Sequence, residues 1–273
     1  IRLDGAIRMA PRWSGSPLMS EPTLLLETRG RVLVMTINRP QAKNAMDFET
    51  ATEIAAALDD LDARDDLSVA VITGAGGTFC SGMDLKGFLA GKRPSLPGRG
   101  FAGLTMRPPR KVLIAAVEGY ALAGGFEMVL ACDMVVASRE AKFGLPEAKR
   151  GLVAAAGGLM RLPNRIPYHI AMEYSLTGDM LTAERAHAYG LINRLAEPGK
   201  ALDIALELAG AIEANGPLAV AASKRVIVES ADWSQAEMFA RQRAITEPVF
   251  ASADAREGAA AFAEKRKPAW TGK

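Results

Sequence analysis

The sequence predicts an α/β fold, in which helices pack on β-sheets. Up to about residue 160, short apolar runs typical of strands alternate with glycine-containing turns and with stretches of helical periodicity. Beyond that point the chain consists mostly of amphipathic helical segments. The 273 residues, 49% of them hydrophobic and 23% charged, suffice for a large buried core in a globular protein. Strands that alternate with helices in this way are typical of the α/β class.

The first elements are predicted to form a β-hairpin. Two β-rich runs, Leu24–Glu27 and Val32–Ile37, flank the sequence TRGR, in which Gly30 suits a tight turn. Pro40 is expected to end the second strand, because proline cannot donate a ladder hydrogen bond.

A helix is predicted over residues 47–65, and further buried strands follow it. Ile54, Leu58 and Leu61 share one face at helical spacing. The short apolar runs VAVITGAG, KVLIAAVEG and MVVAS read as buried strands and cover residues 69–76, 111–119 and 134–138.

The chain is predicted to have three parts. Residues 1–20 lack periodicity, so we expect an extension that is flexible or foreign to the natural chain, the alternative being an ordered arm. Residues 21–205 are predicted to form the α/β core, and residues 206–273 a helical C-terminal region. Within the core, residues 85–110 are rich in glycine, proline and arginine, which predicts a long mobile or variable loop with a functional role.

Charge and composition disfavour several functions. The net charge is only +2 and the basic residues are dispersed, whereas nucleic-acid-binding proteins concentrate them on one face. Cys80 and Cys132 fit no metal or redox spacing and are expected to be reduced core residues of a cytoplasmic protein. His169 and His187 are isolated, so no metal site is predicted. The apolar segment 111–137 contains three acids, which argues against a membrane span.

Two glycine-containing helix starts are candidate anion sites. In LAGGFEMVLACD, Gly124 and Gly125 lie where a strand passes into a helix, and in TGAGGTFCSGMDL the helix begins after Met83. Backbone N–H groups at a helix start lack intrahelical partners and carry partial positive charge. The N–H groups of Met83 and Gly124 are therefore candidates for an oxyanion hole. Alone, each motif is weak: GAGG could be a plain turn, and it lacks the spacing of a dinucleotide-binding loop.

Glu127 and Glu147 are candidate acid–base residues. Glu127 comes just after the glycine pair, and Glu147 follows Pro146 twenty residues further on. Two carboxylates beside an oxyanion site suit general acid–base catalysis, and burial would raise their pKa values. The alternative for Glu147 is that it is only an acid in a first helical turn.

The chain resembles the enoyl-CoA hydratase/isomerase family, also called the crotonase family. The matching motifs follow the family order and cover nearly everything after residue 20: INRPQAKNAM, ITGAGGTFCSGMDL, IAAVEGYALAGGFEMVLACDMVVAS, FGLPEAKRGL, LTGDMLTAERAHAYGLIN and EGAAAFAEKRKPAW. The resemblance implies the crotonase (ClpP/crotonase-like) fold, in which repeated ββα units form the core before a helical C-terminal region.

The resemblance also implies roles for site residues. The N–H groups of Met83 and Gly124 match those that hold the acyl-CoA thioester oxygen. Both glutamates of the hydratases are present, which favours reversible hydration of a trans-2-enoyl-CoA to a 3-hydroxyacyl-CoA. In that reaction Glu127 would orient and deprotonate water, and Glu147 would supply a proton to the α-carbon. No metal or redox cofactor is implied, since acyl-CoA is the substrate.

Further matching positions are candidate contacts of coenzyme A. Lys265 would meet a phosphate, with a solvated helix charge as the alternative, and Asp84 would order its loop. The candidate contacts are Ala42, Lys43, Ala45, Asp84 and Lys265, with Phe262 nearby. The chain departs from the family at Ala155, where many hydratases carry glycine beside the expected water site.

Partners and alternatives follow from the same resemblance. Relatives assemble as trimers or as two stacked trimers, so a homotrimer or homohexamer is expected, without nucleic acid or membrane partners. The alternatives to a hydratase are an enoyl-CoA isomerase, an enzyme like the carnitinyl-CoA dehydratases, and a non-catalytic acyl-CoA-binding protein.

Overall fold

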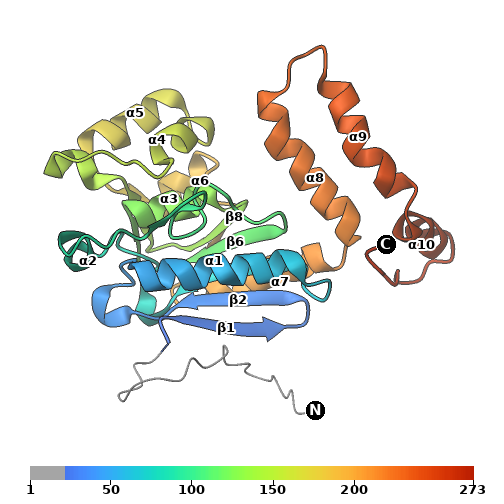
Figure 1. Ribbon diagram of the computed structural model, residues 1–273, viewed down its shortest axis with the longest axis horizontal. Helices are drawn as coiled ribbons and strands as arrows, with labels where there is room; N and C mark the ends of the chain where they lie inside the picture. The colour runs from blue at the N-terminus through green and yellow to red at the C-terminus, as the bar shows by residue number, and fades with distance from the viewer. Residues whose placement is uncertain (1–21) are drawn as a thin grey trace.

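A six-stranded sheet runs through the centre of the molecule (Figure 1), whose computed structural model describes residues 22–273. The extension predicted for residues 1–20 lies outside the described residues. In the strand order β1-β2-β3-β6-β8-β11, β1 is antiparallel to β2 and all other neighbours are parallel. The strands are β1 (Leu24–Arg29), β2 (Val32–Ile37), β3 (Val69–Gly74), β6 (Val112–Val117), β8 (Met134–Ser138) and β11 (Arg194–Ala196). The predicted hairpin is confirmed, and Gly30 at its turn has a φ of 60°.

The central strands are apolar throughout because both faces of the sheet are covered. In β3, Val69 and Val71 belong to one apolar cluster, whereas Ala70 and Ile72 belong to another. Successive side chains of a strand point to opposite faces, so the two clusters lie on opposite sides of the sheet. This arrangement is typical of parallel sheets, which are buried on both faces.

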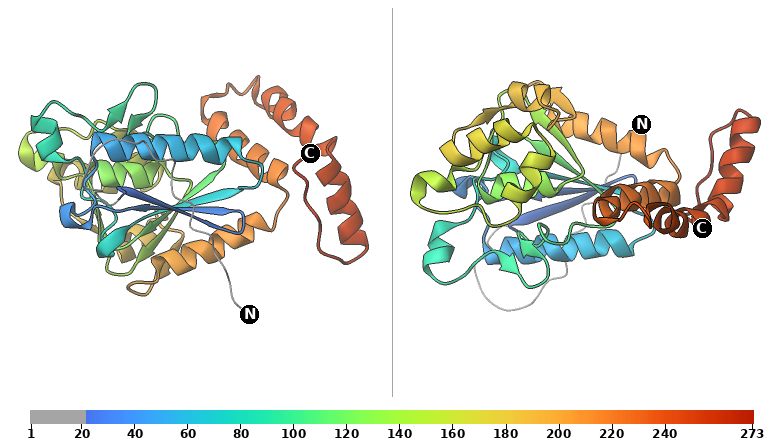
Figure 2. Two further views of the ribbon diagram at one scale, coloured as in Figure 1. Left: turned by 60° about the horizontal axis from the view of Figure 1, so that its bottom comes forward. Right: turned by 90° about the horizontal axis from the view of Figure 1, so that it is seen from above.

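Two helices cover these opposite faces, as the views of Figure 2 show. Helix α1 (Phe48–Ala63) begins after Asp47, whose side chain accepts a hydrogen bond from the Thr50 N–H (2.8 Å). It buries the predicted stripe of apolar residues in the cluster that contains Ala70 and Ile72. Helix α7 (Ala201–Glu213) buries a stripe of alanines in the cluster that contains Val69 and Val71. The predicted α/β class is thereby confirmed.

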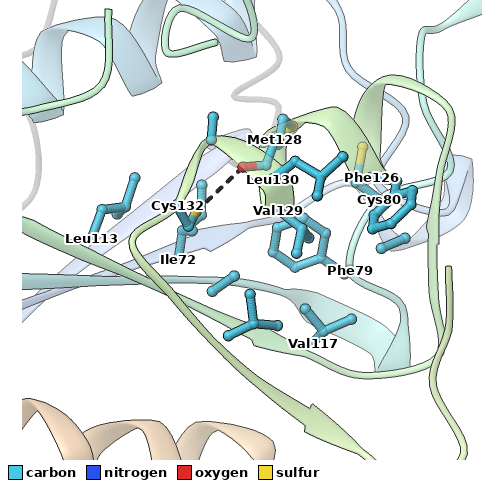
Figure 3. Packing of buried hydrophobic residues seen from close by; sticks show 14 of the residues in the cluster. Ile72, Phe79, Cys80, Leu113, Val117, Phe126, Met128, Val129, Leu130 and Cys132 are labelled. Atoms are coloured by element: carbon cyan, nitrogen blue, oxygen red, sulfur yellow. Dashed lines mark hydrogen bonds between the residues drawn. The ribbon is translucent and has the colours of Figure 1, made fainter. Parts of the chain in front are cut away.

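Helix α3 (Gly124–Ala131) is buried along its whole length, and its apolar side chains are part of the core. Figure 3 shows its residues Phe126, Met128, Val129 and Leu130 among Phe79, Val117 and Ile72 of the same cluster. Both cysteines are free and buried, and the Cys132 Sγ donates to the Met128 carbonyl (3.3 Å). The expectation of reduced core cysteines is consistent with this packing.

A second, three-stranded sheet of order β10-β9-β7 leads into α3 and the helices around it. Its strands are β7 (Tyr120–Leu122), β9 (Lys142–Gly144) and β10 (Leu181–Thr182). The short helices of this half are η1 (Pro40–Ala42), η2 (Ala75–Gly77), η3 (Pro146–Arg150), α4 (Gly158–Arg161), η4 (Leu162–Asn164), α5 (Tyr168–Thr177) and α6 (Ala183–Ala188).

Residues 85–110 contain more regular structure than the predicted loop. They form α2 (Leu85–Leu89) and the two-stranded ribbon of β4 (Ser95–Leu96) with β5 (Gly100–Phe101). Arg99 anchors the ribbon to α1: its guanidinium donates to the Ala55 carbonyl (2.9 Å) and pairs with Asp59 (3.1 Å). Sequence composition predicts the turns of this segment but not its anchoring, which depends on a contact across about forty residues.

The C-terminal region is helical, as predicted. After α7 come α8 (Pro217–Glu229), η5 (Ser230–Asp232), α9 (Met238–Phe250) and α10 (Ala253–Ala263), and the α8–α9 hairpin projects from the body (Figures 1 and 2). Lys224 ties α8 to the core by an ion pair with Asp133 (2.6 Å). The predicted boundary at residue 206 falls inside α7, which packs on the main sheet. Within residues 22–273 no single helix is long and apolar enough to cross a membrane. Only α7 and Pro217–Asp232 taken together, with a bend of 107° between them, have the length and composition of a membrane-spanning segment.

Candidate active site

The loop after β3 lies beside β7, which brings the two predicted helix starts together. Cys80 forms an isolated parallel bridge with Ala121. The Cys80 N–H donates to the Tyr120 carbonyl (3.0 Å), and the Cys80 carbonyl accepts from the Leu122 N–H (3.0 Å). The residues that follow each segment therefore emerge side by side.

Glycines occupy the points where the two segments approach most closely. A β-carbon on Gly82 would lie 3.0 Å from the Ala123 Cβ and 3.6 Å from the Gly124 nitrogen. One on Gly125 would lie 2.3 Å from the Cys80 carbonyl oxygen, a distance that no real side chain tolerates. Glycine at position 125 is thus required by close packing of backbone against backbone.

Ala123 turns the chain from β7 into α3 with a strained conformation. Its φ of 51° and ψ of −126° lie in a region that residues with a side chain rarely adopt. Its N–H donates to the Gly144 carbonyl (2.8 Å), and its carbonyl accepts from the Glu127 N–H (3.0 Å). Strain of this kind persists only where the surroundings impose it, and it is concentrated at functional sites.

The amides of Met83 and Gly124 have no acceptor among residues 22–273. The groups on either side of the Met83 amide are occupied: the Gly82 carbonyl accepts from the Met46 N–H (2.7 Å), and the Asp84 N–H donates to the Met46 carbonyl (2.9 Å). The Gly124 amide belongs to the first turn of α3, where N–H groups have no intrahelical partner. The structure thus brings the two predicted donors together on adjoining loops.

Glu127 is held in one orientation by the turn that precedes α4. Its side chain is buried, with only 3% of the residue's surface exposed. Its Oε1 accepts from the N–H groups of Ala156 (2.7 Å) and Gly158 (2.9 Å). Burial raises the pKa of the Glu127 carboxyl, while the N–H groups of Gly158 and Ala156 and the charge of Arg161 act in the opposite direction.

Glu147 lies in a different setting, in the first turn of η3 behind Pro146. The residue is half-buried, and its Oε2 atom is buried without a hydrogen-bond partner among the described residues. Burial raises the pKa of Glu147, and the charge of Glu127 acts in the same direction, whereas its own N–H and Arg150 lower it. A β-carbon on Gly158 would lie 2.9 Å from the Glu127 Cγ and 3.2 Å from the Leu145 Cδ1, so Glu127 lies close to the segment that carries Glu147.

A cavity of about 580 Å³ adjoins the candidate oxyanion hole. Met83 belongs to both, so the cavity opens directly beside one of the free amides. It is lined by Arg39, Gln41, Ala42, Ala45, Ser81, Met83, Asp84, Leu85 and Lys86. Three predicted coenzyme A contacts, Ala42, Ala45 and Asp84, are therefore part of its wall.

Asp84 and Arg39 fix the wall of this cavity. The Asp84 carboxylate caps α2 by accepting from the Lys86 N–H (3.0 Å), and Arg39 pairs with both Asp84 (2.9 Å) and Asp47 (3.0 Å). The hydrogen bond from Arg39 holds the pKa of Asp84 below its ordinary value. Asp84 is accordingly an anion at neutral pH, and its carboxylate is bound to the loop that begins α2. These contacts agree with the expectation that Asp84 orders this loop.

The two predicted lysine contacts lie elsewhere. Lys43 is exposed and does not line the cavity, although its carbonyl accepts from the Ser81 N–H (3.1 Å) beside it. Lys265 follows α10, at the opposite end of the molecule from α2 in Figures 1 and 2, and Phe262 is 89% exposed there. Within one chain the structure does not bring Lys265 to the cavity.

Known proteins share both this sequence pattern and this architecture. Residues 27–273 match the enoyl-CoA hydratase/isomerase family. The chain belongs to that family. It is 45% identical over 260 residues to the enoyl-CoA hydratase EchA19 of Mycobacterium tuberculosis, covering 91% of this chain and 96% of that protein. It is 42% identical over 261 residues to a carnitinyl-CoA dehydratase of Proteus mirabilis, covering 92% and 99%.

Solved structures of this family have the same fold. The crystal structure of the enoyl-CoA hydratase EchA1 from Mycobacterium marinum is 61% identical and superposes with a TM-score of 0.91, covering 93% of this chain and all of that one. A carnitinyl-CoA hydratase from Mycobacterium avium is 41% identical, with a TM-score of 0.75 and the same coverage. The predicted crotonase fold and family are therefore confirmed.

Several residues of the site in this family member escape prediction from the sequence. The Phe101 ring packs against Gly124 of the candidate oxyanion hole, where a β-carbon on Gly124 would lie 2.4 Å from the ring. Arg39 and Arg161 contact the site only through tertiary structure. Ala155, the departure from the family pattern, is exposed, and it is the next residue, Ala156, whose N–H binds Glu127. Among residues 22–273 no group of histidine, cysteine or acidic side chains could hold a metal ion.

Proposed function

We propose that this protein is an enoyl-CoA hydratase that adds water reversibly to a trans-2-enoyl-CoA. The hydratase activity and the lyase class predicted from the sequence agree with the family and with its named relatives. One observation carries the assignment: two amides without an acceptor among residues 22–273 lie on adjoining loops, and the helix that begins at one of them carries Glu127, whose pKa, like that of Glu147, is raised.

The first step polarises the substrate. The N–H groups of Met83 and Gly124 donate to the thioester carbonyl oxygen, which draws electron density from the conjugated double bond and makes the β-carbon electrophilic. Donors fixed in advance stabilise the enolate oxygen as its charge develops, and losing one such donor costs about 3 kcal/mol in comparable sites.

The second step transfers water across the double bond. Glu127 accepts a proton from water while the water oxygen forms its bond to the β-carbon, and Glu147 gives a proton to the α-carbon as the enolate collapses. Glu127 ends protonated and Glu147 ionised, so one proton returns through solvent before the next turnover. The contacts support these roles. Hydrogen bonds to Oε1 fix the Glu127 carboxylate, and the Oε2 of Glu147, which has no partner within residues 22–273, suits a group that carries a proton.

Coenzyme A is proposed to occupy the cavity beside Met83. The backbone near Ala42 and Ala45 and the loop ordered by Asp84 form its wall, and Lys86 supplies positive charge for the nucleotide phosphates. Lys43 borders this wall through its backbone. A contact between Lys265 and the same coenzyme A requires a second copy of the chain or another placement of α10.

A dehydratase acting on a carnitinyl-CoA-like substrate is the second candidate, because relatives with that name are 42% identical over nearly their whole length. The chemistry is the same addition or loss of water. An isomerase and a catalytically inactive acyl-CoA binder remain the further alternatives.

The proposed function is tested by product analysis in heavy-oxygen water. Crotonyl-CoA and a 4-trimethylammonio-enoyl-CoA are incubated with the enzyme, and the products are analysed by mass spectrometry. Incorporation of one labelled oxygen supports hydration, and the faster substrate separates the two candidates. A shifted double bond without label indicates an isomerase. Equal, near-zero turnover of the wild type and Glu147→Gln with retained coenzyme A binding indicates a binder.

We also propose that the chain forms homotrimers or homohexamers. Large apolar side chains are exposed on the C-terminal helices: Ile227 (74%), Phe239 (70%), Phe250 (77%) and Phe262 (89%). Monomeric proteins rarely leave large apolar patches open to solvent. Sedimentation velocity tests the proposal, and a monomer at micromolar concentration contradicts it.

A further inference from the structure

The orientation of Glu127 depends on a short turn, residues 156–158, at the start of α4. Both hydrogen bonds to its Oε1 come from this turn, from Ala156 and Gly158. Gly157 between them has a φ of 100°, a conformation open to glycine. Movement of the turn would therefore move the carboxylate, so whatever fixes the turn also fixes Glu127.

Arg161 folds back from α4 onto this turn. Its Nη1 donates to the Ala156 carbonyl (3.4 Å), and a β-carbon on Gly157 would lie 2.2 Å from the same nitrogen. The guanidinium therefore covers the turn on the side that a residue larger than glycine would occupy.

The other end of the Arg161 guanidinium binds residues 101–105, the segment that packs against Gly124 of the candidate oxyanion hole. Its Nη2 donates to the Thr105 carbonyl (2.5 Å). Thr105 belongs to the turn after β5, where its N–H donates to the carbonyl of Phe101, the residue that packs against Gly124. Arg161 thus joins the turn that holds the general base to the segment that borders the oxyanion hole.

The charge of Arg161 has no ion-pair partner among residues 22–273. It is half-buried, and its guanidinium donates to two main-chain carbonyls, those of Ala156 and Thr105. A cation without a paired carboxylate contributes little to stability when it is taken out of water. The charges of Arg165 and Glu127 act on Arg161, and the charge of Arg161 acts on Glu127.

We propose that Arg161 is a positioning residue, which holds the Glu127 carboxylate through the 156–158 turn and links it to the segment beside the oxyanion hole. The inference rests on the proposed hydratase function. Arginine suits this task because its planar group presents several fixed donors at once, whereas lysine offers a single compact charge.

Three variants separate position from charge. Arg161→Met removes both hydrogen bonds and the charge, and Arg161→Lys keeps the charge but cannot reach both carbonyls together. Arg165→Met is the matched control, because Arg165 is an exposed arginine four residues on whose side chain makes no hydrogen bond or ion pair with residues 22–273. We expect kcat for crotonyl-CoA to fall about 100-fold in Arg161→Met, the loss typical of a small misplacement. KM should change little, and Arg165→Met should match the wild type.

The pH profile provides a readout that a purely structural role would not move. Glu127 must be ionised to accept a proton, so the hydration rate falls as pH drops through its pKa. The charge of Arg161 favours the ionised form. The acidic limb should therefore move to higher pH in Arg161→Met, whereas Arg161→Lys should keep the wild-type limb while losing part of its kcat.

A measurement without turnover keeps this inference separate from the proposed function. Carbon-13 NMR of enzyme labelled at glutamate carboxyl carbons, with Glu127 assigned through Glu127→Gln, reports the titration directly. A raised apparent pKa in folded Arg161→Met supports the proposal even if no substrate is turned over. An unchanged titration, or a kcat equal to that of Arg165→Met in an active enzyme, overturns it. Calorimetry verifies that each variant is folded, and Arg161→Lys provides the test if Arg161→Met is not.

Discussion

Glu127 and Glu147 have pKa values raised chiefly by burial, yet their surroundings differ. Glu127 lies in the first turn of a fully buried helix, and two main-chain N–H groups grip one of its oxygens. Glu147 lies in a short 3₁₀ helix at the surface, and its buried Oε2 has no partner among the described residues. One carboxyl group is fixed, and the other has an oxygen left free.

The difference indicates how two identical side chains take different roles. A carboxylate that must aim a water molecule benefits from fixed orientation, since positioning accounts for much of the rate enhancement of enzymes. A carboxylic acid that donates a proton needs a raised pKa and an unoccupied oxygen. In the proposed mechanism, these surroundings suit Glu127 to the role of the base and Glu147 to that of the acid.

Neutralising either acid should have the largest effect. We expect Glu127→Gln and Glu147→Gln each to lower kcat for crotonyl-CoA about 10²–10⁴-fold, since each loses a proton-transfer group. The double variant should lose less than the product of both factors, because the groups act on one transition state. Steady-state kinetics measure all three, and strict multiplication of the two losses would show that the acids act independently.

Shortening the acids should sharpen the contrast. An aspartate at position 127 cannot reach both N–H groups of the turn, so Glu127→Asp should lose about 100-fold in kcat. Glu147→Asp has no comparable hydrogen bonds to lose, and its kcat should fall about 10-fold, toward the lower end for displaced acid catalysts. The test is the ratio of the kcat values of Glu127→Asp and Glu147→Asp. A larger loss of kcat in Glu147→Asp would contradict the proposal that Glu127 is the fixed base.

Crowding the fixed acid should have a smaller effect. A β-carbon at Gly158 would lie 2.9 Å from the Glu127 Cγ and 3.1 Å from its Oε1. Gly158→Ala should therefore lower kcat about 10-fold through misplacement and destabilise the fold by about 1–3 kcal/mol.

The control is the same change at an open position. Gly210 is exposed inside α7, and its β-carbon would meet nothing within 4 Å. Gly210→Ala should leave kcat unchanged and stabilise the fold by up to about 1 kcal/mol, the difference in helix propensity. Urea unfolding and kcat are measured for both variants; equal behaviour would mean that the turn tolerates crowding.

The smallest expected effect is a change in how stability varies with pH. An acid whose pKa rises on folding binds its proton more tightly in the native state, so its contribution is present below the ordinary value of 4.5 and is lost as pH rises through the raised value. Glu127→Gln and Glu147→Gln remove this loss. The free energy of unfolding of each variant, relative to wild type, should increase from pH 4 to pH 7, and a difference independent of pH would contradict the raised pKa values.

Local patterns predict much of the fold. The spacing of apolar residues along the sequence predicts the hairpin around Gly30, the apolar stripe of α1 and the short buried strands. Thr182, a residue type favoured at helix N-caps, caps α6, since its side chain accepts from the Arg185 N–H (3.4 Å). Residues 85–110 escape prediction because Arg99 orders them through a distant helix.

The candidate site divides in the same way. Its glycines and acids lie in recognisable motifs, so Gly124, Glu127 and Glu147 can be named from sequence. The strained backbone of Ala123 and the contacts of Arg161 cannot, since they arise only when separate segments meet. The position of Lys265 depends on how α10 is placed, which no local pattern specifies.

The unpartnered amides on adjoining loops have a consequence for mutation. Because peptide nitrogens form the candidate hole, a change of Met83 to any residue except proline replaces the side chain and leaves the donor in place. The donor is lost only through proline or through displacement of the backbone, such as crowding at Gly125 would cause. Evolution can therefore replace the acids while the backbone donors still bind a thioester oxygen. Attempts to redirect this scaffold to new reactions should begin at Glu127 and Glu147.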